Sequence, residues 1–165
     1  MIHHTGTEDT EDAPGSGPEP MLSRQVIGAA IEVHRAPGPG LLESSYQACL
    51  CHELTLRGLA WVQQQGVPLR YNGVSVPTAY RVDLRVERRL VVEVKAIESL
   101  NSIHRAQLLT YLKLLDLRLG LLINFNVEAL VRGIGRVVNG YRALCGLCAS
   151  VVHRMVAWSI LCQPP

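Results

Sequence analysis

Two carboxylates and an amine lie close together in the segment DLRVERRLVVEVK. They belong to Asp83, Glu93 and Lys95. Carboxylate oxygens are ligands that Mg²⁺ prefers, and a metal ion of this kind lowers the pKa of a coordinated water. A neighbouring ammonium can stabilise the negative charge that develops on a phosphate during hydrolysis. These residue types at this spacing are therefore typical of a metal-dependent site that cleaves phosphodiester bonds.

The arrangement of these side chains depends on a predicted β-hairpin. Side chains alternate between the two faces of a strand, and the pattern predicts strands at 80–86 and 90–96. A three-residue loop centred on Arg88 would pair Asp83 with Glu93 and Arg81 with Lys95. The two carboxylates would then lie roughly 5 Å apart, which is destabilising unless a cation neutralises them. A two-residue turn would instead place them on opposite faces of the sheet, so the metal site requires the longer loop.

A solvated strand face is the alternative interpretation. Arg81 and Lys95 could form surface ion pairs with the carboxylates, and composition alone favours this arrangement because charged strand faces are usually in water. The flanking Val91, Val92 and Val94 instead indicate a buried strand, in which an unpaired charge would be costly.

Composition limits the class of protein. The 165 residues suit one domain, and 48% hydrophobic with 18% charged residues is typical of a globular chain. A net charge of +2 permits a nucleic-acid partner without requiring one. We find no basic segment followed by an apolar one near the start, and the cysteines are odd in number, so we expect reduced thiols in the cytoplasm.

The chain divides into a disordered leader (1–20), a domain (21–139) and an apolar tail (140–165). The tail contains His153 and Arg154 near its middle, so we expect a helix that packs or binds a protein partner or a second copy rather than one that crosses a membrane. In the domain, periodicity predicts an α/β (α+β) fold with a mixed four-stranded sheet flanked by helices. The expected order α-α-β-β-β-α-β corresponds to helices from Ser23 to His34 and from Leu41 to Arg57, strands at 62–71, 77–86 and 90–97, a helix from Ser102 to Leu115, and a strand at 119–125. We expect Ser23 and Ser102 to be N-caps, Gly58 to end the second helix, and Asn72-Gly73 to form a tight turn between the first two strands.

Three motifs in this order resemble a known family. GLLESSY (40–46) is similar to the GxxExxY signature, DLRVERRLVVEVKA (83–96) to the D…(D/E)xK core of the PD-(D/E)XK nuclease superfamily, and HRAQLLTYLKL (104–114) to the QxxxY helix of its RecB-like branch. Val82 precedes Asp83 in place of the proline that gives the superfamily its name, but that proline is often missing from its members. The resemblance implies a restriction-endonuclease-like core and a Mg²⁺-dependent nuclease acting on DNA or RNA, with Mn²⁺ as an alternative cofactor.

The resemblance also implies roles for individual residues. Asp83 and Glu93 would be metal ligands together with the carbonyl oxygen of Val94, and Lys95 would orient water or stabilise the transition state. Glu43 would be a further metal ligand or hold a water, although a glutamate in the first turn of a helix is also favoured by the helix dipole alone. Gln107 would orient Lys95 or contact substrate. Tyr111, like Gln107, would orient Lys95 or contact substrate, and Tyr46 could hydrogen-bond into the site. We also count His34 and His104 among the substrate-binding candidates, because they lie near the motifs and could approach phosphate or metal. The simpler role for Tyr46 is packing, and for each histidine a structural contact.

Two further hypotheses remain open at this stage. The same fold could serve as a non-catalytic module that binds nucleic acid or a protein, because the net charge is modest for a DNA-binding protein. An iron–sulfur cluster on Cys145, Cys148 and Cys162 would need a fourth ligand from Cys49 or Cys51. Their spacing is irregular, so we expect free thiols instead.

Overall fold

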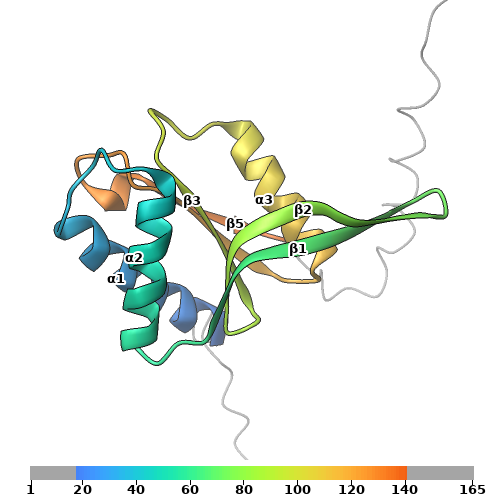
Figure 1. Ribbon diagram of the computed structural model, residues 1–165, viewed down its shortest axis with the longest axis horizontal. Helices are drawn as coiled ribbons and strands as arrows, with labels where there is room; N and C mark the ends of the chain where they lie inside the picture. Colours follow the sequence, from blue (N-terminus) through green and yellow to red (C-terminus); the bar gives the residue numbers. More distant parts are fainter. Residues whose placement is uncertain (1–17, 141–165) are drawn as a thin grey trace, which may run out of the picture.

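The computed structural model describes residues 18–140, in which a mixed five-stranded sheet lies between helices (Figure 1). The expectations for the leader before residue 18, and for Cys145, Cys148, Cys162 and the rest of the tail, lie outside the described residues. The elements are α1 (Pro18–Arg35), α2 (Glu43–Leu56), β1 (Trp61–Tyr71), β2 (Val74–Val86), β3 (Leu90–Lys95), α3 (Ser102–Leu114), β4 (Leu119–Asn124), a 3-10 turn η1 (Leu130–Arg132) and β5 (Ile134–Val138).

The strands lie in their sequence order, β1-β2-β3-β4-β5. The first three form an antiparallel meander, α3 crosses over to place β4 parallel to β3, and β5 returns antiparallel to β4. The expected α/β class is correct, but the expected count of four strands is not. The fifth strand was missed because IGRVV is short, is only partly buried and directly follows a 3-10 turn.

Helices cover the two faces of the sheet unequally. On one face, α1 and α2 pack against apolar side chains such as Leu84, Val92 and Leu121. On the other face, α3 packs against a smaller cluster that includes Val91 and Leu122. The whole of β4 is buried, as its continuous apolar run predicts for a central strand. The sheet therefore holds β3, with its two charged residues, at the centre of the molecule.

The hairpin of β1 and β2 extends beyond the helices (Figure 1). Its turn is Asn72-Gly73, and both residues have positive φ, 45° and 80°, as the expected tight turn requires. Most side chains near this turn are exposed, whereas Val82 and Leu84 at the base of the hairpin are fully buried. The hairpin is therefore anchored only at its base, where Asp83 lies.

Helix ends follow local hydrogen bonding. Gly58 has φ +69° after α2, and Leu59 N–H donates to the carbonyl of Leu54, which is the expected glycine-terminated helix end. Two predicted caps were wrong. Asn101, not Ser102, caps α3 by accepting from backbone N–H groups, and α1 begins at Pro18, so that Ser23 lies inside the helix and donates to Pro20 O. Among the described helices, none is long and apolar enough to cross a membrane.

Gly133 provides a test of the packing between β4 and β5. A Cβ atom at this position would lie 2.2 Å from the backbone oxygen of Asn124, and backbone cannot move aside cheaply. We expect Gly133→Ala to lower the free energy of unfolding by about 3 kcal/mol, measured by urea denaturation. Gly66→Ala is the matched control, because its Cβ would meet only the side chain of Thr78, at 3.3 Å. Equal stability of the two variants would contradict the prediction.

Candidate active site

The bend between β2 and β3 has the length that the site requires. Leu84 pairs with Val92 and Val86 with Leu90, so three residues form the loop, as predicted. The ladder ends at Leu84, however, and the expected direct pairing of Asp83 with Glu93 does not form. The neighbouring strand is irregular at the same level, because Gln64 on β1 has φ +52° and lies outside the β1–β2 ladder. Strand β2 thus leaves β3 at Asp83.

The carboxylate of Asp83, rather than a backbone carbonyl of β2, accepts a hydrogen bond from β3 at this point. Its Oδ2 accepts a hydrogen bond of 3.0 Å from the backbone N–H of Val94, and its Oδ1 accepts one of 3.3 Å from Nε2 of Gln64. The residue is 8% exposed. A buried carboxylate is stable only with such partners, so these bonds fix the carboxylate beside β3.

Lys95 lies within 4 Å of three carboxylates. Its Nζ donates to Glu93 Oε1 at 2.9 Å and lies 3.8 Å from Glu43 Oε1 and 3.9 Å from Asp83 Oδ2. Glu93 and Lys95 are two residues apart on β3, so they share a face, whereas Glu43 comes from the first turn of α2. The structure therefore brings together the four charged residues that the sequence motifs predicted, and we call them the carboxylate–lysine cluster.

The cluster raises the pKa values of both Glu93 and Lys95. The pKa of Glu93 is raised to about 7, first by burial and then by the charge of Asp83, although the hydrogen bond and the charge of Lys95 act in the opposite direction. Burial alone would lower the pKa of Lys95, but its hydrogen bond to Glu93 and the three surrounding carboxylates raise it instead. Lys95 is therefore a permanent cation at neutral pH, while Glu93 titrates near it.

One oxygen of the cluster has no partner. Glu93 Oε2 is buried and accepts no hydrogen bond. Within residues 18–140, no group of three or more His, Cys, Asp or Glu side chains is arranged to hold a metal ion. The ammonium of Lys95 lies near all three carboxylates and partly balances their charge. The donor set, carboxylate oxygens with one unsatisfied atom, still has the chemistry that a hard divalent cation prefers.

Two glutamines that the motifs did not identify connect α2 to the cluster. Gln47 is buried one turn after Glu43, and its Oε1 accepts from Nε2 of Gln64 at 3.2 Å. The same Nε2 reaches Asp83. The spacing of four from Glu43 could have identified Gln47 as a residue on the same helix face. Gln64 could not have been found in this way, since Gln63, Gln64 and Gln65 form an uninterrupted run.

Gln107 and Tyr111 share one face of α3. Nε2 of Gln107 donates to the hydroxyl of Tyr111, and the Tyr111 ring lies 5.4 Å from that of Tyr80 on the hairpin. Burial and then the charge of Glu93 raise the pKa of Tyr111. The pair thus lies within the electrostatic reach of the cluster, while the hydrogen bond of Gln107 is to Tyr111 rather than to Lys95.

Tyr46 and His34 lie in the core behind the sheet. Tyr46 is fully buried and stacks on Phe125 with ring centroids 4.4 Å apart, and its hydroxyl donates to Gly38 O at 2.6 Å. His34 is buried and its Nε2 bonds the carbonyl of Val127 at 2.8 Å. In the structure both side chains make structural contacts, and the substrate contacts expected of them stay a prediction.

The hydroxyl of Tyr46 provides a second stability test. It joins the carbonyl of Gly38 to the N–H of Leu41 and so holds the loop before α2. We expect Tyr46→Phe to lower the free energy of unfolding by about 1 kcal/mol in urea denaturation, because both backbone groups lose a partner. Tyr71→Phe is the control, since Tyr71 is 68% exposed near the hairpin turn. A loss no greater than that of the control would contradict the structural role.

His104 and the described cysteines also have local roles. The Nδ1 of His104 accepts from the backbone N–H of Asn101, which closes a capping box at the start of α3. Cys51 is buried, and burial raises the pKa of its thiol to about 11, whereas Cys49 is exposed. Both are free thiols. Cys51 is therefore a poor nucleophile near neutral pH.

A family model matches most of the chain. The family model described as PD-(D/E)XK nuclease superfamily matches residues 20–137, which is more than half of the chain. The matched range includes the whole carboxylate–lysine cluster and α3. Comparisons with curated proteins and with solved structures gave no significant match.

Proposed function

The chain belongs to the PD-(D/E)XK nuclease superfamily, and from this membership we propose that it hydrolyses phosphodiester bonds of DNA or RNA with the help of Mg²⁺. The observation that carries this proposal is the carboxylate–lysine cluster, in which Lys95 Nζ lies within 4 Å of carboxylates from β2, β3 and α2. Burying charged groups from three elements together costs free energy, and clusters of this kind are typical of functional sites.

Asp83, Glu93 and Glu43 are the residues that we propose as ligands of the divalent cation, with Mn²⁺ as an alternative to Mg²⁺. The unsatisfied, buried Oε2 of Glu93 supports this assignment, because a cation would satisfy it. When bound, such a cation supplies an activated water and neutralises charge on the phosphate. Asp83 already has fixed hydrogen bonds to Val94 and Gln64, so its position costs little to organise.

Lys95 is the residue that we propose to stabilise the reacting phosphate. Its ammonium is largely buried, with a side chain that is 15% exposed, and Glu93 holds it by a hydrogen bond of 2.9 Å. A cation fixed in a site of low dielectric stabilises developing negative charge far more than one in water. During hydrolysis, water oxygen bonds to phosphorus, the ester P–O bond breaks, and the departing oxygen gains a proton.

We further infer that the chain belongs to the GxxExxY group and to the RecB-like branch. The glutamate of GLLESSY is Glu43, and its carboxylate reaches Lys95. Gln107 and Tyr111 occupy the QxxxY positions and share one helix face. In this proposal, Gln107 and Tyr111 on α3 contact the substrate next to the carboxylate–lysine cluster.

The direct test is cleavage by the purified full chain. We expect single- or double-stranded DNA or RNA to be cut with millimolar Mg²⁺ and to remain intact with EDTA. Asp83→Asn keeps an oxygen for Val94 but removes the charge that attracts the cation, so we expect the rate to fall about 10²-fold. Asp116→Asn is the matched control, because Asp116 is exposed in a turn at φ +52°, which asparagine tolerates.

Two outcomes would contradict the enzymatic proposal. Absence of Mg²⁺-dependent cleavage on every substrate would exclude it. If nucleic acid nevertheless bound with equal affinity to the wild type and to Asp83→Asn, the non-catalytic binding module would be the better description. Cleavage that Asp83→Asn does not reduce would point to a contaminating nuclease.

A further inference from the structure

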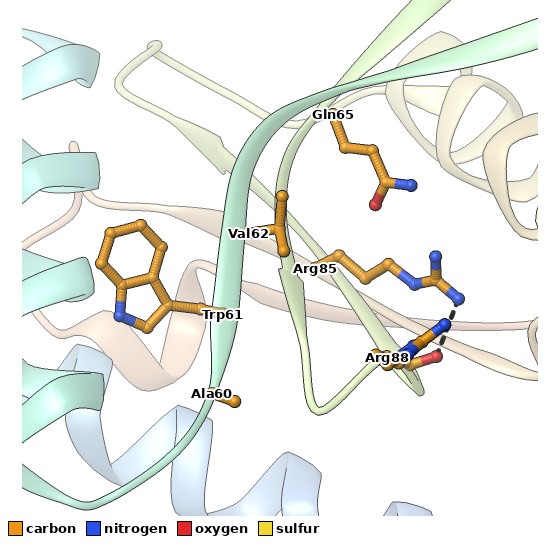
Figure 2. Close-up of a pocket in the computed structure, with 6 residues that line it drawn as sticks. All are labelled: Ala60, Trp61, Val62, Gln65, Arg85 and Arg88. Atoms are coloured by element: carbon orange, nitrogen blue, oxygen red, sulfur yellow. Dashed lines mark hydrogen bonds between the residues drawn. The ribbon is translucent and has the colours of Figure 1, made fainter.

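A pocket with two arginines lies at the base of the projecting hairpin, apart from the carboxylate–lysine cluster. Its volume is about 450 Å³. Figure 2 shows that the side chains of Gln65 and Arg85 extend to the same side of the hairpin and that the guanidinium of Arg85 lies beside Arg88. The pocket is lined by Ala60, Trp61, Val62, Gln65, Arg85 and Arg88. It is therefore bounded by β1, β2 and the loop that joins β2 to β3.

The charged groups that line this pocket are both cations, and no carboxylate in the lining balances them. The lining contains two guanidinium groups and no carboxylate, and among the described residues neither arginine takes part in a salt bridge. Nη2 of Arg85 donates to Arg88 O at 3.0 Å (Figure 2), while its Nε is buried and has no partner. The other N–H groups of the two guanidiniums have no carboxylate partner, so the pocket favours an anion that accepts from them.

The backbone holds the two arginines together. Arg88 has φ +58° in the three-residue loop, and Glu87 before it has φ +50°. The carbonyl of Arg88 fixes the guanidinium of Arg85. A planar guanidinium that is held in this way has paid part of its ordering cost before a ligand binds, and it suits the tetrahedral oxygens of phosphate.

The pocket and the carboxylate–lysine cluster both include residues of strand β2. Arg85 is two residues from Asp83 on β2, which corresponds to about 7 Å along a strand. It pairs with Val91, which is two residues before Glu93 on β3, so Arg85 lies on the face from which Glu93 projects. This separation is comparable to that between neighbouring phosphates of a nucleic-acid strand.

We propose that the pocket of Arg85, Arg88 and Gln65 binds a phosphate of the nucleic-acid strand next to the phosphate that is cleaved. This inference rests on the proposed function. The two arginines donate hydrogen bonds to the phosphate oxygens, and the side-chain amide of Gln65 provides a further donor. The contact is to the backbone of the strand, so it contributes affinity and register without selecting a base sequence.

The test compares the double variant Arg85→Ala/Arg88→Ala with the wild-type full chain. Binding of labelled single-stranded DNA and RNA is measured by fluorescence anisotropy in EDTA at several salt concentrations. We expect Kd to rise about tenfold for every base sequence, and the slope of log Kd against log salt to fall by about one, because one phosphate contact is lost. Arg24→Ala/Arg132→Ala removes the same charge from exposed positions in α1 and η1 and is the matched control.

A conservative variant separates contact from folding. Arg85→Lys/Arg88→Lys keeps both charges but lacks the guanidinium fork, so we expect the salt slope of the wild type with a Kd between those of the wild type and the alanine variant. A Kd and slope equal to those of the arginine control would overturn the phosphate pocket. That result would leave the proposed function intact as long as Mg²⁺-dependent cleavage persists.

Free phosphate is the other source of the same chemistry. Inorganic phosphate that competes with the oligonucleotide, in the wild type but not in the double alanine variant, would support the pocket. If the wild type binds inorganic phosphate at these arginines yet binds no nucleic acid, the assignment to a nucleic-acid strand is overturned. Failure of cleavage with intact binding at the pocket would instead count against the proposed function alone.

Discussion

We expect Lys95→Met to reduce cleavage on the order of 10³-fold and to lower the free energy of unfolding by about 3 kcal/mol near pH 8. The ammonium of Lys95 is the cation that balances the three carboxylates, and its partner Glu93 is 3% exposed. Methionine fills a similar volume, so the loss reflects charge rather than a cavity. Cleavage is measured with Mg²⁺, and stability by urea denaturation in EDTA.

The pH dependence of this variant identifies the cause. Below the pKa of Glu93, that carboxyl group is neutral and the missing cation matters less, so we expect the stability loss to shrink towards acid pH. Lys113→Met is the control, because Lys113 is exposed in the last turn of α3. A Lys95→Met protein as stable as the control near pH 8 would show that the cluster does not depend on this cation.

The position of β3 could be predicted because its sequence carries two independent signals. Val91, Val92 and Val94 indicate a strand buried on both faces, and Glu93 and Lys95 interrupt the pattern on one face only. The odd number of residues in the bend followed from requiring that Asp83 and Glu93 share a face, and the observed pairing of Leu84 with Val92 agrees with it.

The local geometry at Asp83 could not be predicted, since it depends on tertiary contacts. Gln64 adopts a positive φ on an adjacent strand, and its amide reaches both Asp83 and Gln47. No period in the sequence marks such a residue. The ladder ends there because the Asp83 carboxylate, rather than a carbonyl, accepts the N–H of Val94. The sequence pattern therefore predicts the face of the sheet on which Asp83 lies, but not the hydrogen bond that it accepts from Val94.

Roles for polar residues near motifs were the least predictable part. Tyr46 follows Glu43 by three residues on α2, a spacing that places them on neighbouring rather than identical parts of the helix surface. In the structure its ring stacks on Phe125. His34 is likewise close to the motif in sequence but bonds Val127, which is 93 residues away. Proximity along the chain does not determine which side of a sheet a side chain reaches.

The second large effect concerns the titration of Glu93. Its pKa is raised from 4.5 to about 7 in the folded protein, chiefly by burial, so the folded state retains a proton that the unfolded state has released. Stability contributed by the protonated form is therefore complete below about pH 4.5 and is lost as the pH rises to about 7. Glu93→Gln lacks this titration.

We expect the wild type, in EDTA, to lose on the order of 3 kcal/mol of unfolding free energy relative to Glu93→Gln as the pH rises across that window. Glu128→Gln is the control, since Glu128 is exposed and its profile should follow the wild type. Mg²⁺ should reduce the loss only in proteins that retain Glu93, because a cation bound to the carboxylate favours its ionised form. Parallel pH profiles for the wild type and Glu93→Gln would mean that folding does not raise the pKa of Glu93, which would contradict the prediction.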